Sequence, residues 1–202
     1  MRIDIRFTKR PLEDLWCQAI VLLIFKGQGT SSKVLENVNR KMGGSIERLI
    51  NSGIWDGESG EKMLLATQSA IRSDKVLLHG MGQVSEYSIK VLKNEIYNVG
   101  LSLEKINVND FGIHIPKVKG FEKYYGLHVE TTVKFFSKLY LKQYKDSPDY
   151  ILKVLFSVEK NDIAILEKTA EKLRKYFSPL PDCSILLEKE TKQDNNMPDL
   201  AA

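Results

Sequence analysis

The chain alternates between apolar runs of strand length and longer stretches in which apolar residues recur with a helical period. Residues Arg2–Phe7 alternate apolar and polar side chains, which predicts a half-buried strand, whereas Ala19–Phe25 is a continuous apolar run that suits a fully buried strand. Short runs rich in leucine, valine and isoleucine predict further strands at these ranges: 62–68, 75–81, 111–116 and 150–158. The pattern therefore predicts a sheet whose strands come from the whole length of the chain.

Between these strands, apolar residues recur at intervals of three and four, as they do along one side of an α-helix. The clearest stripe consists of Ile89, Leu92, Ile96, Val99 and Leu103. Similar patterns predict helices at these ranges: 33–41, 46–51, 129–140 and 163–177. Strands that alternate with helices predict an α/β domain of three layers, α/β/α, in which helices flank both faces of a mixed sheet.

A change of composition near Pro181 sets the expected boundary of the folded part. Pro179 and Pro181 end the last helical stretch, and a single short apolar run then gives way to a polar segment. We therefore expect one domain over residues 1–181 and a polar, partly disordered C-terminal tail over residues 182–202.

The composition excludes several classes of protein. Of 202 residues, 43% are hydrophobic and 28% are charged, as in an ordinary globular domain. No apolar run approaches the roughly 20 residues of a membrane-spanning helix, so no membrane association is predicted. Cys17 and Cys183 are too few for a disulfide framework, and the cytoplasm is the expected location.

The charge balance adds little about partners. The formal net charge of +4 does not by itself indicate nucleic-acid binding. Basic residues recur between Lys142 and Lys175, and they leave two interpretations open: solvated helix faces, or a surface that binds DNA.

Two pairs of closely spaced glycines are the candidate ligand-binding residues. Gly80 and Gly82 lie in the string HGMGQVS, between a predicted strand and a predicted helix, where phosphate-binding loops occur. A dinucleotide-binding fingerprint needs a third glycine, however, and Ser85 stands at that position. Gly43 and Gly44 separate two predicted helices. For both pairs, the sequence leaves open a structural turn or an anion-binding loop.

No group of reactive side chains matches a catalytic motif. His79, His114 and His128 are far apart in the sequence and lack the spacing of metal ligands, so hydrogen-bonded core or strand-end positions are expected for His79 and His114. No metal-binding or catalytic motif accompanies the adjacent Glu13 and Asp14 in the sequence. We therefore predict no catalytic residue, no metal site and no cofactor.

One longer block is more specific than these separate features. Residues Ala19–Ser88 contain the strings AIVLLIF, GGSIERLINSGIWDGESGE and KVLLHGMG in this order. They resemble the N-terminal domain of the cytosol (leucyl) aminopeptidase family, in which an apolar strand and a helix precede a glycine, a short helix, a glycine-rich turn and two strands. The corresponding pieces are Gly44, Ile46–Gly53, Ile54–Glu61, Met63–Thr67 and Asp74–Gly82. The resemblance implies a macro-domain-like fold, with Gly80 and Gly82 in a shared structural turn.

The same resemblance implies a role without catalysis. The family binds two metal ions in a separate C-terminal half, whose hallmark string NTDAEGR is absent from this sequence. An interaction, assembly or regulatory module is therefore the expected function, and self-association or a protein partner is compatible with it. Three alternatives stay open: a macro-like module that binds a nucleotide or ADP-ribose, a DNA-binding accessory domain, and a fragment of a full metallo-aminopeptidase.

Overall fold

The structure is a computed structural model that describes residues 1–28, 32–180 and 182–188. The strands of its sheet are β1 (Arg2–Thr8), β2 (Ala19–Ile24), β3 (Lys62–Ala66), β4 (Lys75–Gly80), β5 (Asp110–His114), β6 (Ile151–Ser157) and β7 (Cys183–Leu187). The α-helices are α1 (Lys33–Lys41), α2 (Ser45–Asn51), α3 (Ile89–Lys105), α4 (Tyr125–Tyr144) and α5 (Ile163–Phe177). Short 3-10 helices are η1 (Leu12–Asp14), η2 (Val84–Glu86), η3 (Glu122–Tyr124) and η4 (Lys160–Asp162). Within the described ranges, no helix has both the length and the apolar character needed to cross a bilayer.

The sheet has the strand order β3-β4-β2-β5-β6-β1-β7. Strand β3 runs antiparallel to β4, and the remaining neighbours in this order pair in parallel. Parallel neighbours need long crossover connections, which explains why helical stretches separate most strands in the sequence. The predicted mixed sheet is confirmed, whereas its strand order could not be read from the sequence.

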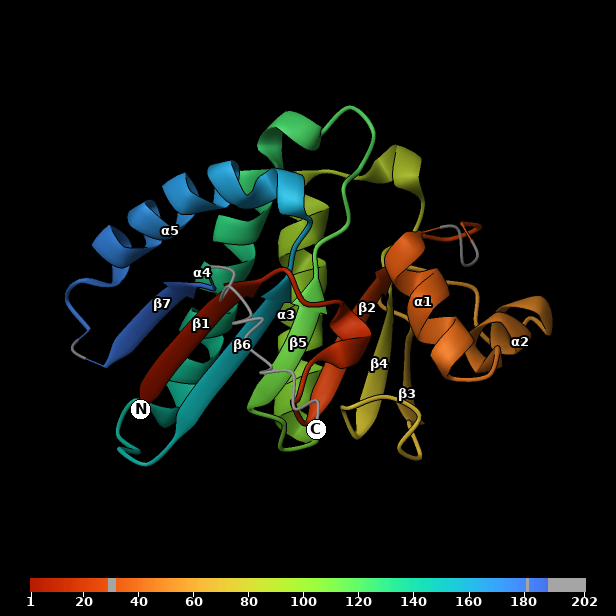
Figure 1. The fold of residues 1–202 in the computed structure, drawn as a ribbon, viewed down its shortest axis with the longest axis horizontal. Helices are drawn as coiled ribbons and strands as arrows, with labels where there is room; N and C mark the ends of the chain where they lie inside the picture. Colours follow the sequence, from red (N-terminus) through yellow and green to blue (C-terminus); the bar gives the residue numbers. More distant parts are fainter. Residues whose placement is uncertain (29–31, 181, 189–202) are drawn as a thin grey trace, which may run out of the picture.

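Helices cover both faces of the sheet, so the predicted three-layer α/β/α fold is confirmed (Figure 1). The apolar stripes of α3, α4 and α5 pack on one face, and α1, α2 and η1 pack on the other over the half that contains β2 and β4. Strand β2 lies between the two layers. Its Val21 and Leu23 belong to the first core and its Ile20 and Leu22 to the second, which is why its sequence is apolar without alternation.

Strand β7 was not predicted. The sequence pattern assigned residues 182–202 to a tail, but Cys183–Leu187 pair in parallel with β1 at the edge of the sheet. Ile185 is 4% exposed and belongs to the same core as α5. The folded part therefore extends to at least Leu187, while the rest of the predicted tail, from residue 189 onward, lies outside the described residues.

A polar network, buried at His79 and Glu95, joins β4 to α3 and to the exposed Ser59 in the turn before β3. His79 Nε2 donates to Glu95 Oε2 at 2.6 Å, because a carboxylate can only accept, and Ser59 Oγ donates to Glu95 Oε1 at 2.7 Å. His79 is 0% and Glu95 4% exposed. The predicted core position of His79 is confirmed, and its partner is a carboxylate on the neighbouring layer.

Candidate functional site

The carboxyl ends of the parallel strands β2 and β5 border a cavity of about 330 Å³, which we call the carboxyl-end cleft. After β2 the chain continues into α1 on one face of the sheet, whereas after β5 it continues into α4 on the opposite face (Figure 1). In open α/β sheets, ligands bind at the carboxyl ends of neighbouring strands whose following connections lead to opposite faces of the sheet. Side chains that line the cleft include Leu23, Phe25, Lys33, His114, Lys117 and Glu159.

His114, at the end of β5, contributes a hydrogen-bond acceptor to the cleft. Its Nδ1 lies 2.9 Å from the carbonyl oxygen of Ser157, so Nδ1 carries the proton and Nε2 does not. Burial lowers the pKa of His114, which keeps the ring neutral. None of the described residues bonds to Nε2, so its lone pair is available to an N–H or O–H donor. The predicted hydrogen-bonded strand-end position of His114 is thus confirmed, while its place in a cleft was not foreseen.

Lys117 fixes one wall of the cleft. Its Nζ lies 2.9 Å from Glu159 Oε2 and 3.0 Å from Asp162 Oδ2, which ties the segment after β5 to the segment after β6. The hydrogen bond from Lys117 lowers the pKa of Glu159. Because two carboxylates already neutralise this ammonium group, Lys117 acts mainly as a brace. In the sequence, this region was marked by His114 and by Pro116, which ends a predicted strand.

Gly80 and Gly82 form a tight structural turn. The N–H groups of Gly80, Met81 and Gly82 donate to the carbonyl oxygens of Glu61, Ile24 and Gly57 at 2.8, 2.9 and 3.0 Å. Gly82 has a φ of +72°, which favours glycine. These N–H groups are therefore already bonded to the protein's own backbone, so they are not available as hydrogen-bond donors to an anion.

Gly43 and Gly44 lie in the connection between α1 and α2, at φ values of +64° and +75°. Their N–H groups donate to the carbonyl oxygens of Arg40 and Asn39 at 3.1 and 2.9 Å. The four predicted ligand-binding glycines do not share one site: Gly80 ends β4 and Gly82 follows it, whereas this pair follows α1. Ligand binding at these glycines stays a prediction, and it cannot rely on their N–H groups.

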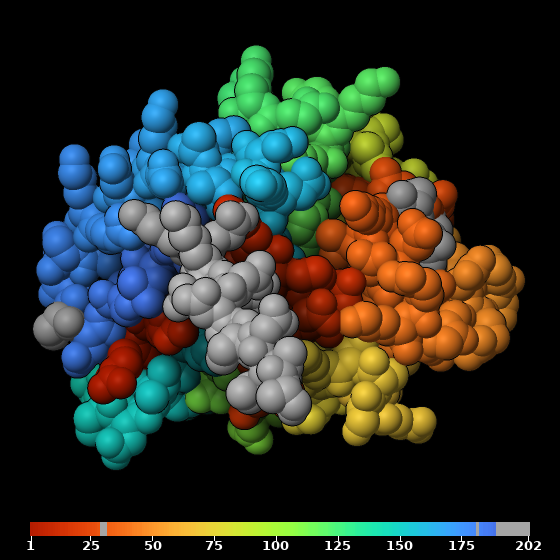
Figure 2. Space-filling view, viewed as in Figure 1, coloured from red at the N-terminus to blue at the C-terminus, as the bar shows by residue number. Residues whose placement is uncertain are grey.

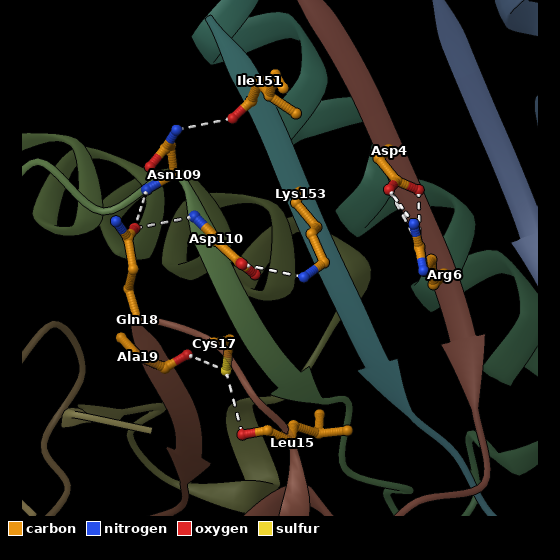
Figure 3. A network of polar contacts seen from close by, with 10 residues as sticks. All are labelled: Asp4, Arg6, Leu15, Cys17, Gln18, Ala19, Asn109, Asp110, Ile151 and Lys153. Carbon is orange, nitrogen blue, oxygen red and sulfur yellow. Dashed lines mark hydrogen bonds and ion pairs between the residues drawn. The ribbon is translucent and has the colours of Figure 1, made fainter. Parts of the chain in front are cut away.

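A polar network covers part of the sheet face beside η1 (Figure 3). On this face Arg6 pairs with Asp4 at 2.7 Å, and Lys153 pairs with Asp110 at 3.0 Å. Cys17 lies at its margin, where burial raises the pKa of the thiol to about 12. A thiol with so high a pKa is inert as a nucleophile near neutral pH.

The basic residues between Lys142 and Lys175 come from different parts of the fold. They lie on α4, β6, η4 and α5 or next to these elements. Lys153 is paired with Asp110 on the sheet, and Arg174 donates to the carbonyl oxygen of Ile185 at 2.9 Å. The set therefore does not form one helix face, and DNA binding stays a prediction.

A second concave surface lies between α3 and α4. We define the α3–α4 groove, with a volume of about 480 Å³, by Tyr97, Leu101, Phe135, Lys138, Leu139, Lys142 and Gln143. Tyr97 is 47% and Leu101 38% exposed. The two helices approach closely at Gly100, which has no side chain: an added Cβ there would lie only 2.5 Å from Leu139 Cδ2. The groove thus combines exposed aromatic and aliphatic surface with two lysines.

Sequence comparisons relate the chain to part of a known enzyme family. The family model for the N-terminal domain of the cytosol aminopeptidase family matches residues 21–147. A probable cytosol aminopeptidase of Gloeothece citriformis is 27% identical over 116 residues, which cover 56% of this chain and 23% of the relative. One of Nitrosomonas eutropha is 29% identical over 135 residues, covering 63% of this chain and 26% of the relative. The chain thus spans about a quarter of the length of the curated relatives it matches.

Comparison with solved structures relates the fold to macrodomains. The macro domain of ganglioside induced differentiation associated protein 2 has a TM-score of 0.65 at 15% identity, covering 85% of this chain and 82% of that one. A Trypanosoma brucei macrodomain has a TM-score of 0.62 at 16% identity, covering 80% and 65%. The same macrodomain in complex with ADP-ribose has a TM-score of 0.59 at 17% identity, covering 84% and 68%. At these identities the likeness shows the fold alone.

Proposed function

Because the chain belongs to the cytosol aminopeptidase family through that family's N-terminal domain, we propose that it acts as a non-catalytic interaction or assembly module. The matched family model describes the N-terminal domain alone, and the sequence lacks the hallmark string of the catalytic half. We also propose a cytoplasmic location, which the names of the curated relatives support.

The observation that carries this proposal is the α3–α4 groove. Exposed aromatic and aliphatic side chains that share a concave surface are typical of protein-binding sites. Tyr97 and Leu101 from α3 and Leu139 from α4 supply the apolar contacts, while Lys138 and Lys142 supply positive charge. The partner that fits this chemistry is an amphipathic helix whose apolar side is flanked by acidic residues.

The groove can be tested with a defined probe. A labelled helical peptide of about 15 residues, with leucines at helical spacing and glutamates between them, should bind the wild-type chain in a fluorescence anisotropy titration. Leu101→Ala should weaken binding about tenfold, which corresponds to about 1.4 kcal/mol for one apolar contact in an interface. Leu127→Ala is the matched control, since Leu127 is 48% exposed on α4 but lies outside the groove.

Two further measurements complete this test. A peptide with lysine in place of each glutamate should bind more weakly, and equal binding of both peptides would count against the assigned charge complementarity. The same preparations, supplied with Mn²⁺ or Zn²⁺, should hydrolyse a leucyl-amide substrate no faster than a metal-free control. Hydrolysis above that control would overturn the non-catalytic role.

A second candidate function is supported by the carboxyl-end cleft. The cleft lies where open α/β sheets bind ligands, and a macrodomain of the same fold has been solved with ADP-ribose. The unprotonated Nε2 of His114 is suited to accept a hydrogen bond from a ligand hydroxyl or amine. As the alternative to a protein partner, we propose binding of a nucleotide or ADP-ribose in this cleft.

Isothermal titration calorimetry with ADP-ribose tests the alternative. If the cleft binds this ligand, His114→Ala should weaken binding about fivefold, because one hydrogen bond contributes about 1 kcal/mol. Leu101→Ala, in the α3–α4 groove, should leave the binding heat unchanged. The absence of heat at millimolar ADP-ribose would remove this candidate without affecting the interaction module.

A further inference from the structure

A third cavity lies at the opposite end of the sheet, where β2 and β4 begin. It has a volume of about 530 Å³, and we call it the amino-end cavity. Its walls come from η1 with the residues after it, from the last residue of α1, and from the loop between β3 and β4. Figure 2 shows the face of the molecule on which these segments meet, with η1 in red, α1 in orange and the β3–β4 loop in yellow. The proposed function uses none of these residues.

The two cations in the amino-end cavity already have partners. Lys41 Nζ, at the end of α1, lies 2.6 Å from Asp14 Oδ1. The guanidinium carbon of Arg72 lies 5.2 Å from the centre of the Trp16 ring, at a distance typical of a cation–π contact. Trp16 is 65% exposed, so its ring also offers surface to a ligand.

Glu13 is the side chain in the amino-end cavity whose charge is unmatched. It is 5% exposed and lines the cavity, yet no hydrogen bond or ion pair joins its carboxylate to any residue in the described ranges. Its carboxylate oxygens are not sealed from solvent, so the group faces the cavity and is accessible to a ligand there. With Asp14 and Asp74, Glu13 gives the cavity three carboxylates against the two cations Lys41 and Arg72, an excess of one negative charge.

From this charge imbalance we propose that the amino-end cavity binds an organic cation, a primary ammonium or guanidinium group, with Glu13 as its counter-ion. An ammonium group would supply the hydrogen bonds that the Glu13 carboxylate lacks, and its alkyl part would contact the Trp16 ring. A metal ion fits less well, since no three His, Cys, Asp or Glu side chains are grouped as ligands within the described residues. The cation comes from a free amine or from a lysine or arginine side chain of a peptide.

The test uses n-butylammonium and n-propylguanidinium chloride, followed by Trp16 fluorescence at constant ionic strength. Trp55 is 1% exposed, so a saturable change reports mainly on Trp16. The wild type should saturate at millimolar probe, and Glu13→Gln should weaken binding at least tenfold. Glu171→Gln, at an exposed position on α5, is the matched control and should bind as the wild type does. An acetylated and amidated Gly-Lys-Gly peptide distinguishes a peptide side chain from a free amine, depending on which binds more tightly.

Thermal unfolding provides a second readout. Because Glu13→Gln removes an unmatched charge, it should unfold at a temperature no lower than that of the wild type, and the probe should raise the midpoint of the wild type only. Equal fluorescence changes in wild type and Glu13→Gln would overturn the proposal. A large drop in the unfolding temperature of Glu13→Gln would also overturn it, since Glu13 would then be a structural residue.

Discussion

Gly80→Ala should be among the most destabilising single substitutions in this domain, with a cost of at least about 3 kcal/mol in the free energy of unfolding. A Cβ at Gly80 would lie 2.0 Å from the carbonyl oxygen of Glu58 and 2.6 Å from the carbonyl carbon of Gly57. This backbone cannot easily move, because Glu61 Oε2 accepts hydrogen bonds from the N–H groups of Gly57 and Glu58 at 2.8 and 3.2 Å. The added methyl group must therefore displace the whole turn.

Urea denaturation at neutral pH measures this cost. Gly53→Ala is the control: Gly53 has a φ of +70°, but a Cβ at this position would meet no atom within 4 Å, so only the left-handed backbone is penalised, by about 1–2 kcal/mol. Gly80 lacks a positive φ, so its cost is steric. If both variants lost the same stability, the close approach of the turn to β4 would not be the reason for this glycine.

Glu95→Ala should cost about 3–5 kcal/mol, because it leaves the buried donor His79 Nε2 without its acceptor, whereas Ser59, which is exposed, can bond to water instead. Burial alone would raise the pKa of Glu95, but the hydrogen bonds from His79 and Ser59 outweigh burial and lower it. The stabilisation by this carboxylate is thus fully present above the ordinary glutamate pKa of about 4.3 and is lost as the pH falls through the lower folded-state value.

Urea unfolding at several pH values between 7 and 3 tests both parts of this expectation. The difference in unfolding free energy between wild type and Glu95→Ala should be largest near neutral pH and should shrink below about pH 4.3. Glu104→Ala, in the same helix, should cost less than about 1 kcal/mol, since its hydrogen bonds to Gln143 and Tyr144 are near the surface. A difference for Glu95→Ala that grew on acidification would contradict the assigned pKa direction.

Periodicity was sufficient to predict the layers of the fold but not the way the strands join. The stripe from Ile89 to Leu103 predicts a helix from its spacing alone. The run Ala19–Phe25 predicts a fully buried strand from its unbroken apolar character. The five residues of β7 contain no such repeat, and their strand conformation depends on pairing with β1, which is about 180 residues away in the sequence. Local patterns cannot show a contact of that kind.

The sites were harder to predict because they depend on which groups folding leaves without partners. The sequence placed Gly80 at the junction of a strand and a turn, where β4 ends, but the acceptors that occupy the N–H groups of this turn come from Glu61, Ile24 and Gly57. His114 and Glu13 were visible only as an isolated histidine and half of an acidic pair. Their free lone pair and unmatched charge arise from tertiary burial.

The position of β1 between β6 and β7 also affects how the domain is made. Both neighbours of this strand lie far towards the other end of the described chain, so β1 leaves the ribosome long before it can pair. Contacts this distant in sequence slow folding, because a long loop must close before they form. The edges of β1 therefore stay unpaired at first, and completion of the sheet depends on β6 and β7, which are translated after its other strands.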